Sequence, residues 1–369
     1  MDESRLITIK DVAKDAGVSA QTVSNVINTP QRVRPDTRNR VHHSIQKLGY
    51  KPNASARRLR TSRSDTVALG IHPADSPIFD RFLHALTAET DMRDLRILLY
   101  KTDTAEDEIS HFESLLATSD VDAFILTDVT FDDPRPDWLR QHNQTFSLFG
   151  RPWGADINDP TISWVDVDGR DGTRRITQHL ILNGYRNIGF VGWRPPSSTG
   201  HDRLSGWRDA MMAAKLCSEE QLERLTVFTD DDVASGQQAF QIMSQSNADL
   251  DAVVCISDTI AAGVYMETHG DITITGFDDT PISRSLNFSS IRQPLNDIAK
   301  AILDSLQQQR THGEDARMHL LLPPATRHTL TSIYCPYSSS HHNQQRSSHA
   351  FIPPTAHQPQ HGTGYCAAR

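Results

Sequence analysis

The chain has 369 residues, of which 37% are hydrophobic and 22% charged, a composition that suits a globular protein of two or three domains. No apolar run approaches the roughly 18 residues that a membrane span needs, and the acidic start MDESRLITIK lacks the apolar segment of a signal peptide. The four cysteines stand far apart without C-x-x-C spacing, so we expect no disulfide framework, no metal site and no cofactor, in a reducing cytoplasm.

Charge is distributed unevenly along the chain. Residues 1–63 carry 13 Lys and Arg against 5 Asp and Glu, whereas the remaining 306 residues carry 24 against 41. This asymmetry predicts that the N-terminal segment meets a polyanion while the rest repels it. A solvated basic surface is the alternative, and nucleic-acid binding is favoured over it because the charge coincides with a helical motif.

Residues 8–28 predict two short helices on either side of Gly17, with Thr8 capping the first helix through its hydroxyl and Ser19 capping the second. The apolar positions of the second helix are Val23, Val26 and Ile27. Its opposite face carries the polar side chains of Gln21, Thr22, Ser24, Asn25 and Asn28. Small donors and acceptors on an exposed helix can read base edges in the major groove, so the pattern predicts a helix-turn-helix.

A third helix is expected over about 36–48, followed by the basic segment GYKPNASARRLRTSRS. In that segment Asn53 can cap one short helix, residues 54–60, which carries Arg57 and a single large apolar side chain, Leu59. Such a helix suits the minor groove, where an apolar side chain pries apart a base step. A flexible basic linker is the alternative.

The stretches TIKDVAKDAGVSAQTVSNVIN, TRNRV and LGYKPNASARRLRT resemble the DNA-binding head of the lactose-repressor (LacI/GalR) family of bacterial transcription regulators. The resemblance implies a homodimer on a pseudo-palindromic DNA operator, with Ala20, Gln21 and Asn25 reading bases. It also implies a hinge helix in which Leu59 enters the minor groove. The full set of expected DNA-binding residues is Thr8, Ser19, Ala20, Gln21, Thr22, Ser24, Asn25, Asn28, Asn53, Ala56, Arg57 and Leu59.

Asn25 stands where the family most often has Arg. Arginine pairs with guanine through two hydrogen bonds, whereas asparagine pairs best with adenine. We therefore expect the operator of this protein to depart from the commonest family half-site at that base pair.

From Thr66 onward, short apolar runs alternate with helical patterns. The expected strands are VALGI, RILLY, AFILT, FSLFG, ISWVDV, IGFVG, LTVFT, AVVCIS and ITITGF. This alternation predicts parallel sheets with helices on both faces, in which ligands bind beyond the carboxyl ends of the strands. We find no phosphate-binding loop, nucleophile elbow or H-E-x-x-H motif, so the sequence does not indicate an enzyme.

The motifs RNIGFVG, DRLSGW, ISDTIAAG, TGFDD and IRQPL resemble the sensor of the same family, which is similar to periplasmic sugar-binding proteins. The expected fold class is an all-α helix-turn-helix head joined by a hinge helix to an α/β two-lobed sensor with parallel sheets. The expected divisions are a head (1–50), a hinge helix or linker (51–63), a sensor and dimerisation domain (64–333) and a disordered tail (334–369).

The resemblance implies an effector cleft between the lobes, with Arg203, Asp258 and Phe79 at cleft positions. Arginine and aspartate can grip vicinal hydroxyls, and an aromatic face stacks on a sugar ring. The alternatives are a surface ion pair for Arg203, a helix cap for Asp258 and a core position for Phe79. Arg151 and Trp153 follow a predicted strand in FGRPWG and are further candidates, although Trp153 can also plug the loop.

The favoured function is a repressor of carbohydrate-utilisation genes, a cytoplasmic, nucleoid-associated protein whose operator affinity a small effector controls. Asp231 lies near a family position sometimes occupied by an aromatic residue, which favours a sugar over a purine. The alternatives are an activator or dual regulator, a nucleobase-responsive member and, less favoured, a solute-binding receptor. After METHG the chain is several residues shorter than the family pattern, and a harmlessly shortened loop is the preferred explanation.

The C-terminal segment from about residue 334 is rich in Ser, His, Gln and Pro. It has too few apolar residues to build a core, so we expect disorder. Its histidines lack the spacing and carboxylate support of a metal site. No leucine heptads indicate a tetramerising coil.

Overall fold

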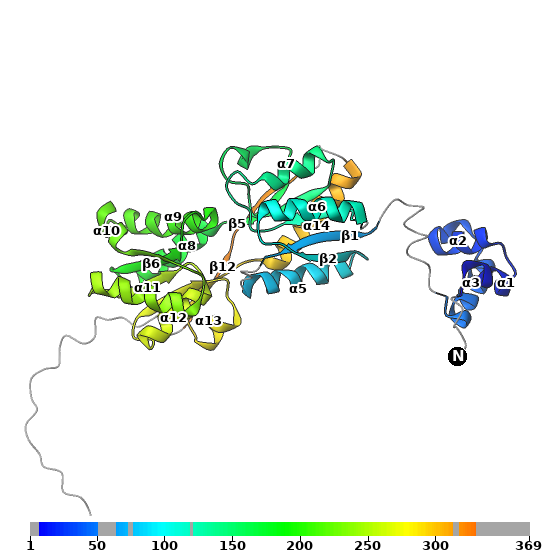
Figure 1. Ribbon diagram of the computed structural model, residues 1–369. Helices are drawn as coiled ribbons and strands as arrows, with labels where there is room; N and C mark the ends of the chain where they lie inside the picture. Colours follow the sequence, from blue (N-terminus) through cyan, green and yellow to red (C-terminus); the bar gives the residue numbers. More distant parts are fainter. Residues whose placement is uncertain (1–6, 51–63, 73–76, 119–120, 313–316, 330–369) are drawn as a thin grey trace, which may run out of the picture. The chain divides into compact units, whose positions relative to one another are not determined.

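The computed structural model describes residues 7–50, 64–72, 77–118, 121–312 and 317–329 (Figure 1). The predictions for Asn53, Ala56, Arg57 and Leu59, and for the tail 334–369, lie outside the described residues. In the part described, no helix is long and apolar enough to cross a membrane.

Over the described residues 7–50, the head contains three α-helices and one 3-10 turn. These elements are α1 (Ile9–Ala16), α2 (Ala20–Asn28), η1 (Pro30–Arg32) and α3 (Pro35–Leu48). Gly17 and Gly49 end α1 and α3 with φ of 65° and 64°, a left-handed conformation that costs glycine little. The three predicted helices are therefore present, with the third beginning one residue earlier, at Pro35.

Valines form the centre of the head. Val12, Val23, Val26 and Val41 are each at most 1% exposed, and Ile27 packs beside them half-buried. Their spacing of three or four residues within α2 puts them on one side of that helix. The polar side of α2 is thereby left facing outward.

The sensor contains two six-stranded sheets with the orders β11-β5-β4-β3-β1-β2 and β12-β10-β9-β8-β6-β7. The strands of the first lobe are β1 (Thr66–Ile71), β2 (Arg96–Lys101), β3 (Ala123–Leu126), β4 (Phe146–Phe149), β5 (Trp164–Val167) and β11 (His319–Leu322). Those of the second are β6 (Ile188–Trp193), β7 (Thr226–Thr229), β8 (Ala252–Cys255), β9 (Thr273–Phe277), β10 (Ser289–Arg292) and β12 (Ala325–Arg327). Neighbours pair in parallel except β10 with β12.

Helices cover both faces of each sheet. The helices of the first lobe are α5 (Pro77–Asp91), α6 (Ala105–Thr118), α7 (Pro134–Gln141) and α14 (Leu295–His312), with the 3-10 turn η2 (Gly154–Asn158). Those of the second are α8 (Gly169–Leu182), α9 (Ser198–Ala213), α10 (Glu219–Arg224), α11 (Val233–Ser246), α12 (Asp258–Thr268) and α13 (Pro281–Ser285). Although α14 is far along the chain, it returns to the first lobe beside α5 (Figure 1).

The chain passes between the lobes three times, at residues 167–169, 292–295 and 322–325. Both sheets are dominated by parallel strands, so each lobe has one edge at which strand carboxyl ends gather. The segments that follow β4, β6, β8 and β9 contain most of the candidate effector residues. The two-lobed fold expected from the sequence is confirmed.

All nine predicted strands are present, and β10, β11 and β12 were not predicted. The short connection between α12 and β9, residues 269–272, forms a tight turn that is closed by a hydrogen bond. His269 and Gly270 take positive φ of 52° and 80°, the Asp271 N–H donates to the Thr268 carbonyl at 2.9 Å, and β9 begins at Thr273.

Candidate DNA-binding surface and effector site

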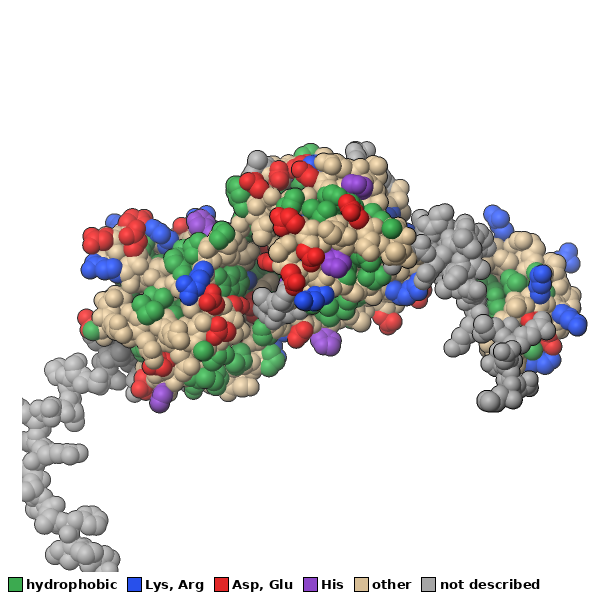
Figure 2. All heavy atoms as spheres, in the orientation of Figure 1, with side chains coloured by type: hydrophobic (Ala, Val, Ile, Leu, Met, Phe, Trp, Pro, Cys, Tyr) green, Lys and Arg blue, Asp and Glu red, His purple; other side chains and the backbone are tan. Residues whose placement is uncertain are grey.

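The outward side of α2 carries the predicted base-reading residues. Ser19 caps the helix, because its hydroxyl accepts from the Thr22 N–H at 3.1 Å. Gln21 and Asn28 are exposed, and Ala20 and Asn25 are half-buried. Lys and Arg side chains also lie on the surface of the head (Figure 2).

Two of these side chains form a hydrogen-bonded unit. The Gln21 Nε2 donates to the Asn25 Oδ1 at 3.0 Å across one turn of the helix. Asn28 Nδ2 donates to the Ser24 carbonyl at 2.6 Å. The side-chain amide of Asn25 is thus held beside that of Gln21. A substitution of either residue therefore removes a hydrogen bond that orients the other side chain.

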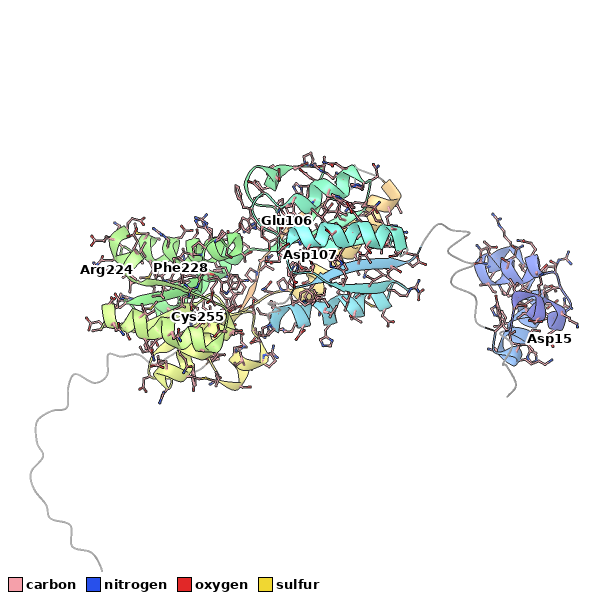
Figure 3. All side chains as sticks on the ribbon, in the orientation of Figure 1. Asp15, Glu106, Asp107, Arg224, Phe228 and Cys255 are labelled. Carbon is pink, nitrogen blue, oxygen red and sulfur yellow. The ribbon has the colours of Figure 1, made fainter. Side chains whose placement is uncertain are left out.

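Thr8 begins α1 with a capping box, in which its side chain receives the backbone N–H of Asp11 as predicted. The Asp11 carboxylate in turn accepts from the Thr8 N–H at 2.9 Å and from the Thr8 hydroxyl at 2.7 Å. Elsewhere in the head, Lys47 of α3 donates to Asp15 of α1 at 2.7 Å, and Figure 3 marks Asp15. Hydrogen bonds from Lys47 and Ser44 hold the pKa of Asp15 below its usual value.

In the sensor, Arg203 of α9 is buried between two aromatic rings. Its guanidinium carbon lies 3.6 Å from the centre of the Phe277 ring and 5.1 Å from that of Trp193. Nη1 donates to the Ile256 carbonyl at 2.8 Å, and Nη2 lies 3.9 Å from Asp278 Oδ1. Burial lowers the pKa of Arg203, an effect that the charge of Asp278 opposes.

Asp278, which follows β9, is the carboxylate that Arg203 meets. Its N–H donates to the Ile291 carbonyl at 2.6 Å, and Oδ1 accepts from Gln293 Nε2 at 2.6 Å. Burial raises the pKa of Asp278, whereas the charge of Arg203 lowers it. The TGFDD stretch contained this residue, but its proximity to Arg203 depends on how strand ends converge.

Arg151 joins the two lobes. It belongs to the first lobe, and its Nη2 lies 2.7 Å from Asp202 Oδ2 at the start of α9 in the second. Its Nε lies 3.2 Å from Asp166 Oδ2 of β5, and its guanidinium carbon is 4.6 Å from the centre of the Trp153 ring. Burial raises the pKa of Asp166, and Arg151 opposes that shift.

Electrostatic interactions also connect Arg203 with Asp166 and Asp202. We call the following residues the interlobe cluster: Arg151, Asp166, Asp202, Arg203 and Asp278. Sequence reasoning named the two arginines and missed the three carboxylates.

Asp258 has a different environment. At the start of α12 it is 1% exposed. Its Oδ2 accepts from the Thr280 N–H at 2.6 Å and the Thr280 hydroxyl at 2.8 Å, and its Oδ1 from the Ser290 hydroxyl at 2.6 Å. Burial raises the pKa of Asp258 to about 6. Asp258 therefore stabilises the segment after β9 through hydrogen bonds to Thr280 and Ser290. Phe79, in the first lobe, packs on the apolar core of that lobe.

Buried N–H groups without a partner gather around the cluster. Among the described residues, Arg203 Nε and Trp193 Nε1 are buried and make no hydrogen bond, whereas the buried Arg151 Nε has the Asp166 carboxylate at 3.2 Å. Buried donors of this kind are costly unless an acceptor reaches them. The arrangement suits a ligand rich in oxygen atoms.

Comparisons with known proteins match both parts of the chain. Residues 8–53 match the model of bacterial regulatory proteins of the lacI family, and residues 64–321 match the periplasmic binding proteins and sugar-binding domain of that family. The transcriptional regulator CelR of Thermobifida fusca is 31% identical over 84% of this chain and 95% of its own length. Catabolite control protein A of Staphylococcus xylosus is 28% identical over 86% and 96%.

Solved structures agree with this assignment. A transcriptional regulator CelR–cellobiose complex is 27% identical with a TM-score of 0.65, covering 88% of this chain and 99% of its own. A lac repressor dimer bound to operator shares the fold, with a TM-score of 0.75 at 22% identity over 89% of this chain and all of its own. The chain therefore belongs to the lacI family of bacterial regulatory proteins and is a DNA-binding transcriptional regulator rather than an enzyme.

Proposed function

We propose that this regulator is a repressor whose operator affinity is controlled by a neutral carbohydrate bound at the interlobe cluster. The observation that carries the proposal is a pair of buried N–H groups that make no hydrogen bond, Arg203 Nε and Trp193 Nε1, which stand beside the Asp278 carboxylate and the Phe277 ring. Sugar hydroxyls accept from such donors and donate to Asp278 and Asp202 at the same time. The ring of Trp153 or Trp193 offers a face for the C–H side of a sugar.

The charge of the cluster favours a neutral ligand. Three carboxylates surround two guanidinium groups, and each arginine already has a carboxylate within 4 Å. A phosphorylated or acidic sugar would add negative charge to a site with an acidic excess, which disfavours its binding. The CelR–cellobiose complex among the similar structures supports the carbohydrate class.

For the head, we propose that α2 enters the major groove of a pseudo-palindromic operator, with Gln21 and Asn25 reading bases. Two copies of the chain bind one operator, since two-fold symmetry in the DNA matches two-fold symmetry in the protein. The divisions 1–50, 51–63, 64–333 and 334–369 remain the proposed boundaries of head, hinge, sensor and tail. The bacterial cytoplasm, where the operator is, is the proposed location.

A thermal-shift screen of the full chain tests the effector. The ligands are cellobiose, glucose, glucose 6-phosphate and hypoxanthine. We expect stabilisation by a neutral sugar and none by the phosphorylated sugar or the nucleobase. A ligand that binds only the folded state raises the free energy of unfolding by RT ln(1 + [L]/Kd), and the melting temperature rises with it.

Arg203→Met should abolish the sugar-dependent shift. Arg208→Met is the matched control on the same helix, since Arg208 pairs with Glu219 at the surface, and it should keep the shift. Stabilisation by hypoxanthine alone would refute the carbohydrate assignment, and an equal loss in both variants would refute the role of the cluster.

A further inference from the structure

We propose that Arg81 is a positioning residue that sets the separation of the two lobes and the orientation of Asp278 in the effector site. The proposal rests on the function proposed above for the interlobe cluster. Its starting point is a contact between the lobes that involves no side chain of the cluster.

Arg81 lies on α5 of the first lobe and reaches backbone carbonyls of the second. Its Nη1 donates to the carbonyl of Asp278 at 2.5 Å and to that of Asp279 at 2.8 Å. The φ angles of these two residues are 102° and 49°, values that residues with a side chain adopt at a cost. A charged donor shared by both carbonyls stabilises this turn and ties it to α5.

The turn carries a side chain of the effector site. Asp278 presents its carboxylate to Arg203 and Gln293, and its own carbonyl is held by Arg81. The side-chain pair Arg151–Asp202 also joins the lobes, but a ligand hydroxyl can compete for either of those groups. The contact of Arg81 uses backbone carbonyls and therefore leaves the Asp278 carboxylate available to a ligand.

The helices α5 and α14 link this contact to the first residues of the sensor, which precede β1. Arg93, just after α5, donates to Asp304 of α14 at 2.7 Å. Further along α14, Arg310 lies 3.0 Å from Asp122 Oδ2. The Asp122 carboxylate accepts from the N–H groups of Ser64 and Asp65 at 3.0 and 2.9 Å. A displacement of the turn at Asp278 can thus reach the residues that precede β1 through packed, hydrogen-bonded elements.

Distance measurement by double electron–electron resonance tests the role of Arg81 without any ligand. Spin labels are placed at exposed sites in the two lobes, Glu106→Cys on α6 and Arg224→Cys on α10, both marked in Figure 3. The background of the full chain carries Cys217→Ser, Cys335→Ser and Cys366→Ser and keeps the buried Cys255.

We compare Arg81→Met, Arg81→Lys and the control Arg93→Met. Arg81→Met should broaden or lengthen the distribution of distances between lobes, and Arg81→Lys, which retains a charged donor, should restore most of it. Arg93→Met removes contacts within the first lobe, so it should lower the melting temperature and leave the distribution unchanged.

An Arg81→Met distribution identical to that of the unsubstituted protein would overturn the proposal, as would equal broadening in Arg93→Met. If Arg81→Met fails to fold, Arg81→Gln decides by the same criterion. None of these outcomes depends on the identity of the effector. The distance measurement can therefore refute the role of Arg81 independently of the result of the carbohydrate screen.

Discussion

Replacing Asp279 by asparagine should strongly destabilise the second lobe. The Asp279 side chain is fully buried and accepts from three arginines: Arg284 Nη2 at 2.9 Å, Arg292 Nε at 2.5 Å and Arg327 Nε at 2.5 Å. Burial alone raises the pKa of Asp279, but the hydrogen bonds from these arginines outweigh burial and hold the pKa below its usual value. The carboxylate therefore links α13, β10 and β12 in its charged form.

The magnitude follows from the exposure of the three arginines. Removing one partner of a buried ion pair costs about 3–5 kcal/mol. Arg284 and Arg292 are 53% and 48% exposed and can regain water, whereas Arg327 is 20% exposed. We therefore expect the lower end, about 3 kcal/mol for Asp279→Asn, or a loss of about 6–12 °C in melting temperature.

Urea unfolding of the full chain at pH 7 measures this loss. Asp230→Asn is the matched control, because Asp230 pairs with Arg194 at the surface with both side chains more than 60% exposed. Such a pair contributes about 0–1 kcal/mol. The stabilisation by Asp279 is fully present above the unfolded pKa of about 3.9 and is lost as the pH falls through the lower folded pKa.

The difference in free energy of unfolding between Asp279→Asn and the unsubstituted protein should thus become smaller only below about pH 4. A loss at pH 7 equal to that of the Asp230→Asn control would refute the reasoning. A gap that narrows already between pH 7 and pH 5 would show that another group is responsible.

Three further variants test the head and the support of the effector site. Asn25→Arg should move the preferred base at one operator position from adenine to guanine, which selection from a random DNA pool measures; an unchanged preference contradicts the base-reading role. Ser19→Ala should cost about 1 kcal/mol in urea unfolding, because the Thr22 N–H loses its cap. Asp258 has a folded pKa of about 6, above the unfolded value of about 3.9, so its contribution to stability should fall by about 2 kcal/mol as pH rises from 4 to 7. In Asp258→Asn, the free energy of unfolding measured in urea should lack this dependence on pH. An equal pH dependence in Asp258→Asn and in the unsubstituted protein would contradict the buried environment of Asp258.

The core strands were predictable because their residues are apolar on both sides. Runs such as AFIL in β3 and AVVC in β8 are fully buried, the pattern typical of a parallel sheet covered by helices. Two of the three strands that were missed have another character. β10 reads SSIR, with its serines buried among polar partners, and β12 has only three residues, so neither gives a hydrophobic signal. β11 reads HLLL, and its residues alternate between exposed and half-buried, so it differs from the fully buried core strands.

The proposed effector site was only partly predictable for a different reason. Arg203 and Arg151 stand in recognisable local motifs, whereas the partners Asp278 and Asp202 are brought to them by segments 50–75 residues away in the chain. Asp258 was predicted as an acid that directly follows a strand. Its three hydrogen bonds to Thr280 and Ser290 depend on the position of β10, which the sequence pattern did not reveal.

The most direct test of the account is binding of the full chain to DNA upstream of its own gene, measured by gel shift with and without cellobiose, glucose and hypoxanthine. We predict specific binding that weakens steeply with salt, because the head anchors on phosphates, and an affinity that changes when a neutral sugar is present. Binding that is insensitive to salt would contradict recognition by the basic head. Specific binding that every sugar leaves unchanged, while hypoxanthine alters it, would contradict carbohydrate control.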